Sequence, residues 1–169
     1  MFLYLQQATT CLAELNQSLE SSILGSMKSF FDAIVKPELL KHEDWDVKLL
    51  VATSLCEITR ITAPEAPDDV LKDIFQLIVS TFSGLDDTSG PSFGQRVVIL
   101  ETISKYRSCV VMLDLECDDL VNDIFHTFFA AARDDHPESV LSSMQNIMTV
   151  LLEETEDVRE DLLSIYCLC

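Results

Sequence analysis

The fold of this chain is decided by two helical patterns that lie on either side of a pair of prolines. Residues 44–82 read DWDVKLLVATSLCEITRITAPEAPDDVLKDIFQLIVSTF. Apolar residues recur at three- and four-residue spacing before and after residues 63–67, which is the signature of amphipathic helices. Two prolines this close together cannot continue a hydrogen-bonded helix. The stretch therefore predicts two helices joined by a stiff connection, with Asp44 capping the first and Asp68 or Asp69 capping the second.

The same helical spacing continues in both directions from this pair. Gly and Pro are scarce, at 4 and 5 residues, and no segment has the alternation of a strand. Pro37 is expected to open a short helical turn, and Gly84 to stop the second helix of the pair. Other helices are expected over about 5–19, 27–34, 93–106, 117–132 and 137–152, with a last one starting near residue 157.

Consecutive helices with short connections predict an all-α fold. The spacing from one helix pair to the next is about 40 residues, the period of HEAT and armadillo units. We therefore expect HEAT/armadillo-like helical hairpins that form a short right-handed solenoid, with residues 1–169 as a single segment. The chain stops inside a helical pattern at Tyr166–Cys169. This predicts the N-terminal part of a longer solenoid, truncated near residue 164.

Composition and charge exclude several classes of protein. Apolar residues make up 48% of the chain, which excludes a disordered protein. The 29 acidic and 11 basic side chains give a formal net charge of −18, which argues against direct nucleic-acid binding by this segment. No run of about 18 apolar residues predicts a membrane span. The six cysteines lack the paired spacing of a secreted disulfide scaffold, so a reducing compartment is expected.

Acidic clusters are the most visible candidates for chemistry. A calcium loop that started at Asp86 would need a closing Glu at its twelfth position, where Val97 stands. Pairs of carboxylates arise by chance in so acidic a chain, so solvated helix faces are the favoured interpretation. The clusters comprise Asp114, Glu116, Asp118, Asp119, Asp123, Asp134, Asp135, Glu153, Glu154, Glu156 and Asp157.

Histidine and cysteine side chains offer weaker candidates. A zinc site could be imagined from His42, His126 and His136 with Cys109 and Cys117, but the two cysteines are eight residues apart, and structural zinc ligands usually pair at two to four. Helix packing is favoured, although spacing alone leaves a Cys and His catalytic dyad open. Phosphate-loop, nucleophile-elbow and dinucleotide motifs are all missing from the sequence. We therefore expect neither an enzyme nor a bound cofactor.

Two features leave more than one interpretation open. Trp45 stands in a charged stretch at a helix start and either packs across the first turn, which is favoured, or remains exposed as a contact residue. Residues 63–67 read APEAP. They are either a tight interhelical connection or a pre-organised surface that a partner peptide approaches closely.

Several longer runs of the sequence match a known family. They are Val35–His42, Asp46–Ala52, Glu57–Pro67, Asp69–Phe75, Phe82–Thr88, Val111–Cys117 and Arg133–Leu141. Together they resemble the N-terminal region of the sister-chromatid-cohesion regulators that are named for precocious dissociation of sisters, most closely the plant branch. The likeness extends to about Leu163.

The resemblance implies a HEAT-repeat cohesin regulator that acts through protein contacts, in the nucleus and on chromatin through cohesin. Family members bind the kleisin subunit of cohesin and, with the wings-apart-like release factor, take part in maintaining and releasing cohesion during cell division. Plant members are also associated with DNA repair. In the family, the loop that corresponds to Ala63, Pro64, Glu65 and Ala66 docks short motifs of cohesin regulators, and Pro67 completes the expected site.

The sequence departs from the family pattern directly after this loop. Family members generally place a tyrosine and a small insertion after Pro67, whereas this chain continues with Asp68 and Asp69. Loss of the aromatic ring is expected to weaken motif docking. Two other classes remain as alternatives: an unrelated armadillo adaptor, such as a nuclear-transport segment that binds basic peptides, and a helical hydrolase that uses carboxylates or Cys109.

Overall fold

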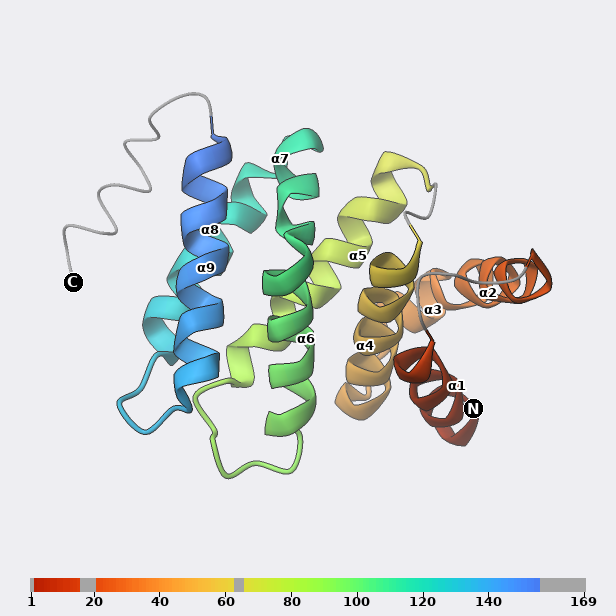
Figure 1. Cartoon of the computed structure of the whole chain (residues 1–169), viewed down its shortest axis with the longest axis horizontal. Coiled ribbons are helices and arrows are strands. Elements are labelled where there is room, and N and C mark those ends of the chain that lie inside the picture. Colours follow the sequence, from red (N-terminus) through yellow and green to blue (C-terminus); the bar gives the residue numbers. More distant parts are fainter. Residues whose placement is uncertain (1, 16–20, 63–65, 156–169) are drawn as a thin grey trace. The chain divides into compact units, whose positions relative to one another are not determined.

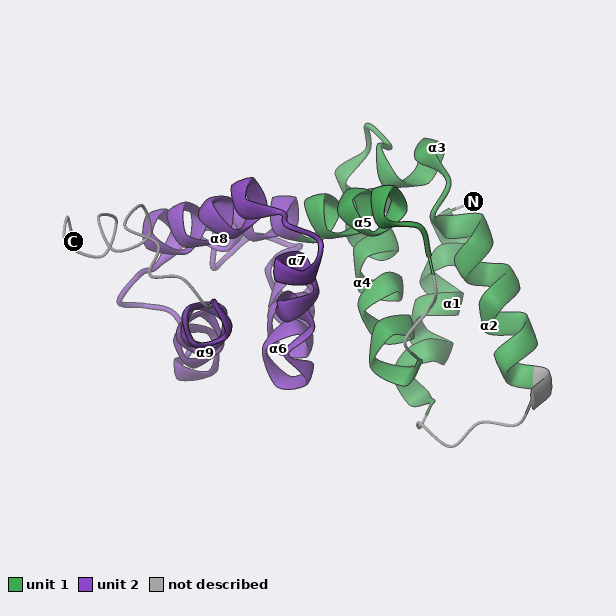
Figure 2. Cartoon of the chain, turned by 90° about the horizontal axis from the view of Figure 1, so that it is seen from above, with its two compact units in different colours: residues 1–78 green, residues 79–169 purple. Residues whose placement is uncertain are grey.

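A computed structural model describes residues 2–15, 21–62 and 66–155 of the chain. All regular structure in these ranges is helical (Figure 1). The elements are α1 (Phe2–Glu14), α2 (Ser21–Ile34), α3 (Pro37–Leu40), α4 (Trp45–Ile61), α5 (Asp68–Thr81), η1 (Phe82–Gly84), α6 (Phe93–Tyr106), η2 (Ser108–Val110), α7 (Val111–Asp114), α8 (Asp118–Ala131) and α9 (Glu138–Glu154). The chain divides into two compact units, residues 1–78 and 79–169 (Figure 2).

Unit 1 is organised around α4. Nearly every side chain from Val47 to Ile58 on this helix is buried, because α1, α2 and α3 all pack against it. Leu5 and Leu12 of α1 are buried, and so are Met27, Phe31 and Ile34 of α2. Burying a side chain of this size contributes about 1.5–3 kcal/mol, so the apolar stripes read from the sequence supply most of the stability of this unit.

The start of α4 confirms one prediction and corrects another. The carboxylate of Asp44 accepts a hydrogen bond of 2.9 Å from the amide of Asp46, as expected of an N-cap. Trp45, in contrast, does not pack across the first turn, which was the favoured prediction. Its side chain is 43% exposed, and the Lys48 ammonium lies 4.7 Å from the centre of its ring. The attraction between the ammonium and the face of the indole ring stabilises the ring in this exposed position.

Unit 2 has an aromatic and aliphatic core between α6, α8, α9 and η1. The rings of Phe82 and Phe128 are both buried, and their centres lie 5.2 Å apart in a tilted arrangement. A partly buried polar contact joins α6 to α9, because the Asn146 amide donates to the carbonyl and the hydroxyl of Ser104 at 3.2 and 2.9 Å. The unit is therefore held by both apolar packing and specific hydrogen bonds.

Gly84 ends a different element from the one expected. The α-helix α5 stops at Thr81, and the chain continues as the 3-10 turn η1 up to Gly84. The described glycines all have negative φ, so Gly84 is not a left-handed helix stop. Instead the Arg96 guanidinium lies against it and donates to the Thr81 carbonyl, and a Cβ at Gly84 would come within 2.7 Å of Arg96 Nε. The missing side chain makes room for that arginine.

The turn after α6 has a conformation that the sequence pattern did not predict. Arg107 is left-handed, with φ of 54°, and η2 and α7 follow it before α8 begins. Its guanidinium donates to Glu154 of α9 at 2.8 Å.

Within the described ranges, none of the helices has both the length and the apolar composition that a membrane crossing needs.

Candidate functional site

The candidate site is the connection between α4 and α5. The helix α4 ends at Ile61, and Thr62 continues in extended conformation, with its amide donating to the Ile58 carbonyl at 2.8 Å. Ala63, Pro64 and Glu65 lie outside the described residues. The described remainder is accessible, since Ala66 is half-buried and Pro67 is exposed.

The exit of the connection is acidic. Asp68 and Asp69 are both exposed in the first turn of α5, where the helix dipole favours carboxylates. The helix begins at once, because the Leu71 amide donates to the Pro67 carbonyl at 3.0 Å. The connection is therefore short and bounded by two well-formed helix ends.

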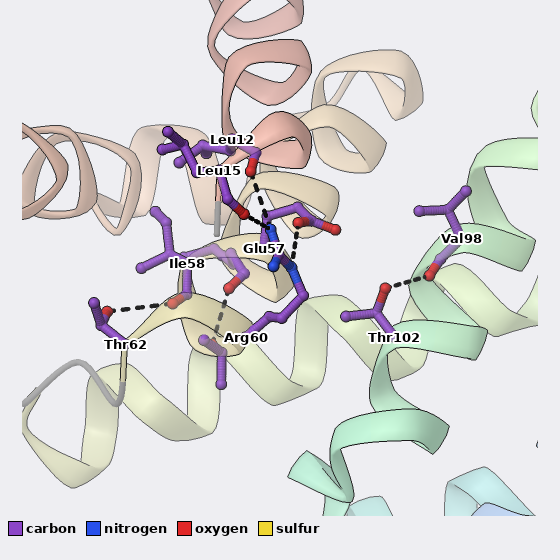
Figure 3. A network of polar contacts seen from close by, with 10 residues as sticks. Leu12, Leu15, Glu57, Ile58, Arg60, Thr62, Val98 and Thr102 are labelled. Carbon is purple, nitrogen blue, oxygen red and sulfur yellow. Dashed lines mark hydrogen bonds and ion pairs between the residues drawn. The ribbon is translucent and has the colours of Figure 1, made fainter. Parts of the chain in front are cut away.

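A polar network fixes the end of α4 just before the connection (Figure 3). Arg60 donates through Nε to Glu57 at 2.7 Å, and through its Nη2 atom to the carbonyls of Leu12 and Leu15 at 3.1 and 2.9 Å. The Arg60 and Glu57 side chains are only 14% and 9% exposed. Sequence reasoning missed this pair; the available signal was the spacing of three residues between a glutamate and an arginine inside an apolar helix.

The acidic clusters behave as solvated surface, as predicted. The described members, which exclude Glu156 and Asp157, are all exposed. Asp118 and Asp119 lie in the first turn of α8, and Arg133 lowers the pKa of Asp135 through a hydrogen bond of 2.8 Å. No group of three potential metal ligands occurs among residues 2–15, 21–62 and 66–155.

The three histidines lie in three different environments. His42 accepts a hydrogen bond from the Asp44 amide at 3.0 Å, and His126 is exposed on α8. His136 is buried: its Nδ1 accepts from the Arg133 amide at 3.2 Å, and its Nε2 donates to the Leu85 carbonyl at 2.7 Å. Both nitrogens of His136 are thus occupied by backbone, which indicates a structural role that sequence spacing could not reveal.

Cys56 and Cys109 do not have the environment of nucleophiles. Cys109 and Cys117 are buried, and burial raises the pKa of the Cys109 thiol to about 11. Burial also raises the pKa of Cys56 well above its ordinary range. A thiol with such a pKa stays protonated near neutral pH and is a poor nucleophile. The alternative of a hydrolase that uses Cys109 therefore loses its support.

Comparison with known proteins decides the family. The family model described as "Sister chromatid cohesion protein PDS5 protein" matches residues 1–166. The chain belongs to the PDS5 family. Its similarity to Arabidopsis thaliana PDS5 homolog A is 68% identity over 163 residues, which is 95% of this chain and 10% of that protein. Similarity to the Arabidopsis homolog C is 49% over 163 residues, 95% of this chain and 19% of that protein.

A solved PDS5-family structure has the same fold. A chain in the structure of the Pds5–Scc1 complex matches with a TM-score of 0.87 and 28% identity, over 97% of this chain and 24% of its own length. This confirms the all-α fold of HEAT-type helical hairpins and the resemblance to the plant-type N-terminal region. Membership of this family also excludes the alternative of an unrelated armadillo adaptor, such as a nuclear-transport segment. The chain spans between about a tenth and a fifth of the length of its curated Arabidopsis relatives.

Proposed function

We propose that this chain is a protein-binding segment of a cohesin regulator that acts in the maintenance and release of sister chromatid cohesion. The observation that carries the proposal is the match of nearly the whole chain to a chain of the Pds5–Scc1 complex. The proposed partners are the kleisin subunit of cohesin, the wings-apart-like release factor and other cohesin regulators. The proposed location is the nucleus, on chromatin through cohesin, and a contribution to DNA repair is part of the proposal.

The charge of the segment supports contact through protein rather than nucleic acid. A net charge of −18 repels phosphate, and the exposed acidic clusters add to that repulsion on unit 2. Direct catalysis is not part of the proposal. The exposed carboxylates and buried thiols described above do not form a nucleophile that is activated by a neighbouring base or by a lowered pKa.

The docking site within the proposal is Ala63, Pro64, Glu65, Ala66 and Pro67. Small side chains let the backbone of a partner approach closely, and prolines lose little conformational entropy when a partner binds. The accessible Pro67 and half-buried Ala66 are compatible with this role. The first-turn carboxylates of Asp68 and Asp69 stand where family members place an aromatic ring, so we expect weaker docking than in relatives that keep it.

A titration with a matched control tests the site. A labelled peptide that carries the docking motif of the wings-apart-like factor is titrated against the wild-type chain, Pro64→Arg and Pro91→Arg. Pro91 is an exposed proline in a different connection of the chain, so its replacement adds the same charge and bulk outside the proposed site. The proposal expects binding to wild type and Pro91→Arg and loss of binding to Pro64→Arg. Equal affinity for all three proteins removes the loop from the site.

The kleisin contact needs its own experiment. Purified chain is mixed with overlapping fragments of the kleisin subunit and passed over a sizing column. Co-elution with one fragment supports a contact through this segment. Separate elution with every fragment places kleisin binding outside residues 1–169.

A further inference from the structure

The helix α1 buries few of its side chains against the rest of unit 1. Of its thirteen residues, Leu5 and Leu12 are buried, whereas twelve of the seventeen residues of α4, the helix that it packs against, are buried. The other side chains of α1 are exposed or half-buried, including Phe2, Leu3 and Tyr4 at its start. Apolar burial stabilises in proportion to the area removed from water, so α1 is held more weakly than α4.

The sequence of α1 also lacks the features that stabilise a helix on its own. Residues 2–13 carry no charge, so ion pairs between side chains one turn apart cannot form. The first turn has no acidic residue and the last turn no basic residue to complement the helix dipole. Thr9 and Thr10 are β-branched residues of low helix propensity. A helix of thirteen residues with this sequence is marginal in water, so α1 is expected to stay helical only while it is docked on α4.

The contact between α1 and α4 is polar in its middle and at its end. The buried Ser54 hydroxyl of α4 donates to Thr9 at 2.7 Å, because the hydroxyl proton of Thr9 is already donated to a carbonyl within α1. At the end of α1, Arg60 donates to the carbonyls of Leu12 and Leu15 at 3.1 and 2.9 Å (Figure 3). All these groups can bond to water when α1 leaves, and exchanging a protein hydrogen bond for one to water costs little net stability.

The rest of unit 1 keeps its own contacts when α1 leaves. Arg60 donates through Nε to Glu57, one turn earlier on α4, at 2.7 Å. This ion pair lies within α4, so undocking of α1 leaves it intact and exposes it to water, where charged groups are well solvated. The helices α2 and α3 also pack on α4, where Ile34 of α2 and Leu40 of α3 are buried. Removal of α1 therefore leaves this packing in place.

We propose that α1 is a latch, a helix that undocks from α4 and unfolds as one unit while the rest of unit 1 stays folded. In the closed form α1 covers Ser54 and Arg60. In the open form α4 presents this hydroxyl and this guanidinium to solvent, so unit 1 shows a surface that the closed form hides. The latch is a property of unit 1 and does not depend on the proposed docking function of residues 63–67.

Hydrogen exchange of the full chain measures the opening. Amides in the middle of α1 are expected to be about a hundredfold less protected than amides in the middle of α4, such as that of Val51. The reason is that α1 exchanges through the open form, whereas α4 exchanges only when unit 1 unfolds. Protection of the two helices that agrees within about threefold overturns the proposal.

Two variants separate opening of the latch from unfolding of the unit. Thr9→Val removes the bond with Ser54, which exists in the closed form alone, so exchange in α1 is expected to become about fivefold faster. Ile34→Val weakens packing that the closed and open forms share. It is expected to speed exchange in α4 about fivefold and to leave α1 within about twofold of wild type. If Ile34→Val accelerates α1 and α4 equally, α1 opens only with the whole unit, and the proposal is overturned.

Thiol labelling gives a second readout with an internal control. Ser54→Cys places a thiol under α1, whereas the natural Cys56, buried two residues further along, lies on the opposite side of α4. Mass spectrometry identifies each labelled site. Position 54 is expected to react about a hundredfold faster than Cys56, because the open form uncovers the first and not the second. Equal labelling rates at the two positions contradict the latch.

Discussion

Replacing the buried His136 by leucine gives a sharp test of how unit 2 is held together. The imidazole joins two connections of the chain, since Nε2 donates to the Leu85 carbonyl and Nδ1 accepts from the Arg133 amide. It also stacks on Phe93, with ring centres 6.0 Å apart. Leucine keeps an apolar contact with Phe93 but can make neither hydrogen bond.

The expected cost follows from these two bonds. Leaving a buried donor or acceptor without its partner costs about 1–3 kcal/mol, so losing both is expected to cost about 3 kcal/mol in the free energy of unfolding. With a urea dependence of about 2 kcal/mol per molar, the unfolding midpoint of unit 2 moves down by about 1.5 M.

Urea unfolding followed by circular dichroism and by the fluorescence of a probe on α9 measures this shift. His126→Leu is the matched control, because His126 is exposed on α8, and its replacement is expected to change stability by at most about 0.5 kcal/mol. A His136→Leu midpoint indistinguishable from that of His126→Leu would refute the idea that this histidine links the two connections.

Two further predictions concern glycine and cysteine. Gly84→Ala places a Cβ against the Arg96 guanidinium, which must move away and lose its hydrogen bond to the Thr81 carbonyl, so a loss of about 1 kcal/mol is expected. Gly94→Ala, with no atom near its Cβ position, is expected to stabilise α6 slightly, and comparison of thermal unfolding checks the opposite signs. Burial raises the pKa of Cys109 from 9.0 to about 11, so the thiol of the unfolded chain ionises at lower pH than the thiol of the folded chain. The contribution of Cys109 to the free energy of unfolding is therefore full below pH 9 and is lost between pH 9 and pH 11. The loss is at most about 1.4 kcal/mol for each pH unit. Urea midpoints of wild type and Cys109→Ala at pH 7 and pH 10 test this, and a wild-type midpoint that falls no more than that of Cys109→Ala contradicts it.

Local sequence rules were reliable wherever one residue dictates its own backbone. Pro37 opens α3 because its ring fits only the first turn of a helix, and Asp44 caps α4 through its own carboxylate. The apolar stripe of α4 was predicted from spacing alone because burial there is nearly complete. The expected helix over 93–106 coincides with α6.

Features that depend on distant residues were out of reach. Gly84 has the sequence context of a helix stop, but its reason is an arginine twelve residues later, and no local rule connects the two. The links of Arg60 to α1 and of His136 to Leu85 join positions more than 40 residues apart. The prediction for Trp45 was wrong because Lys48, three residues later, makes a cation–π contact with the indole ring and leaves it exposed.

For the candidate site, too, only part of the information was available from the sequence. Composition left residues 63–67 undecided between a connection and a docking surface, and only the family resemblance favoured the second. The family assignment is confirmed by comparison, whereas the docking role stays a prediction. The physical support around the site, the Arg60 and Glu57 pair, emerged only from three-dimensional contacts.

Site-specific photo-crosslinking tests the central proposal most directly. Benzoylphenylalanine is placed at position 65, inside the proposed docking site, or at position 89, an exposed serine of unit 2, and each protein is irradiated with purified wings-apart-like factor. We expect a crosslinked product from position 65 that the unlabelled motif peptide competes away, and none from position 89. Equal crosslinking from both positions, or crosslinking from position 89 alone, would contradict it.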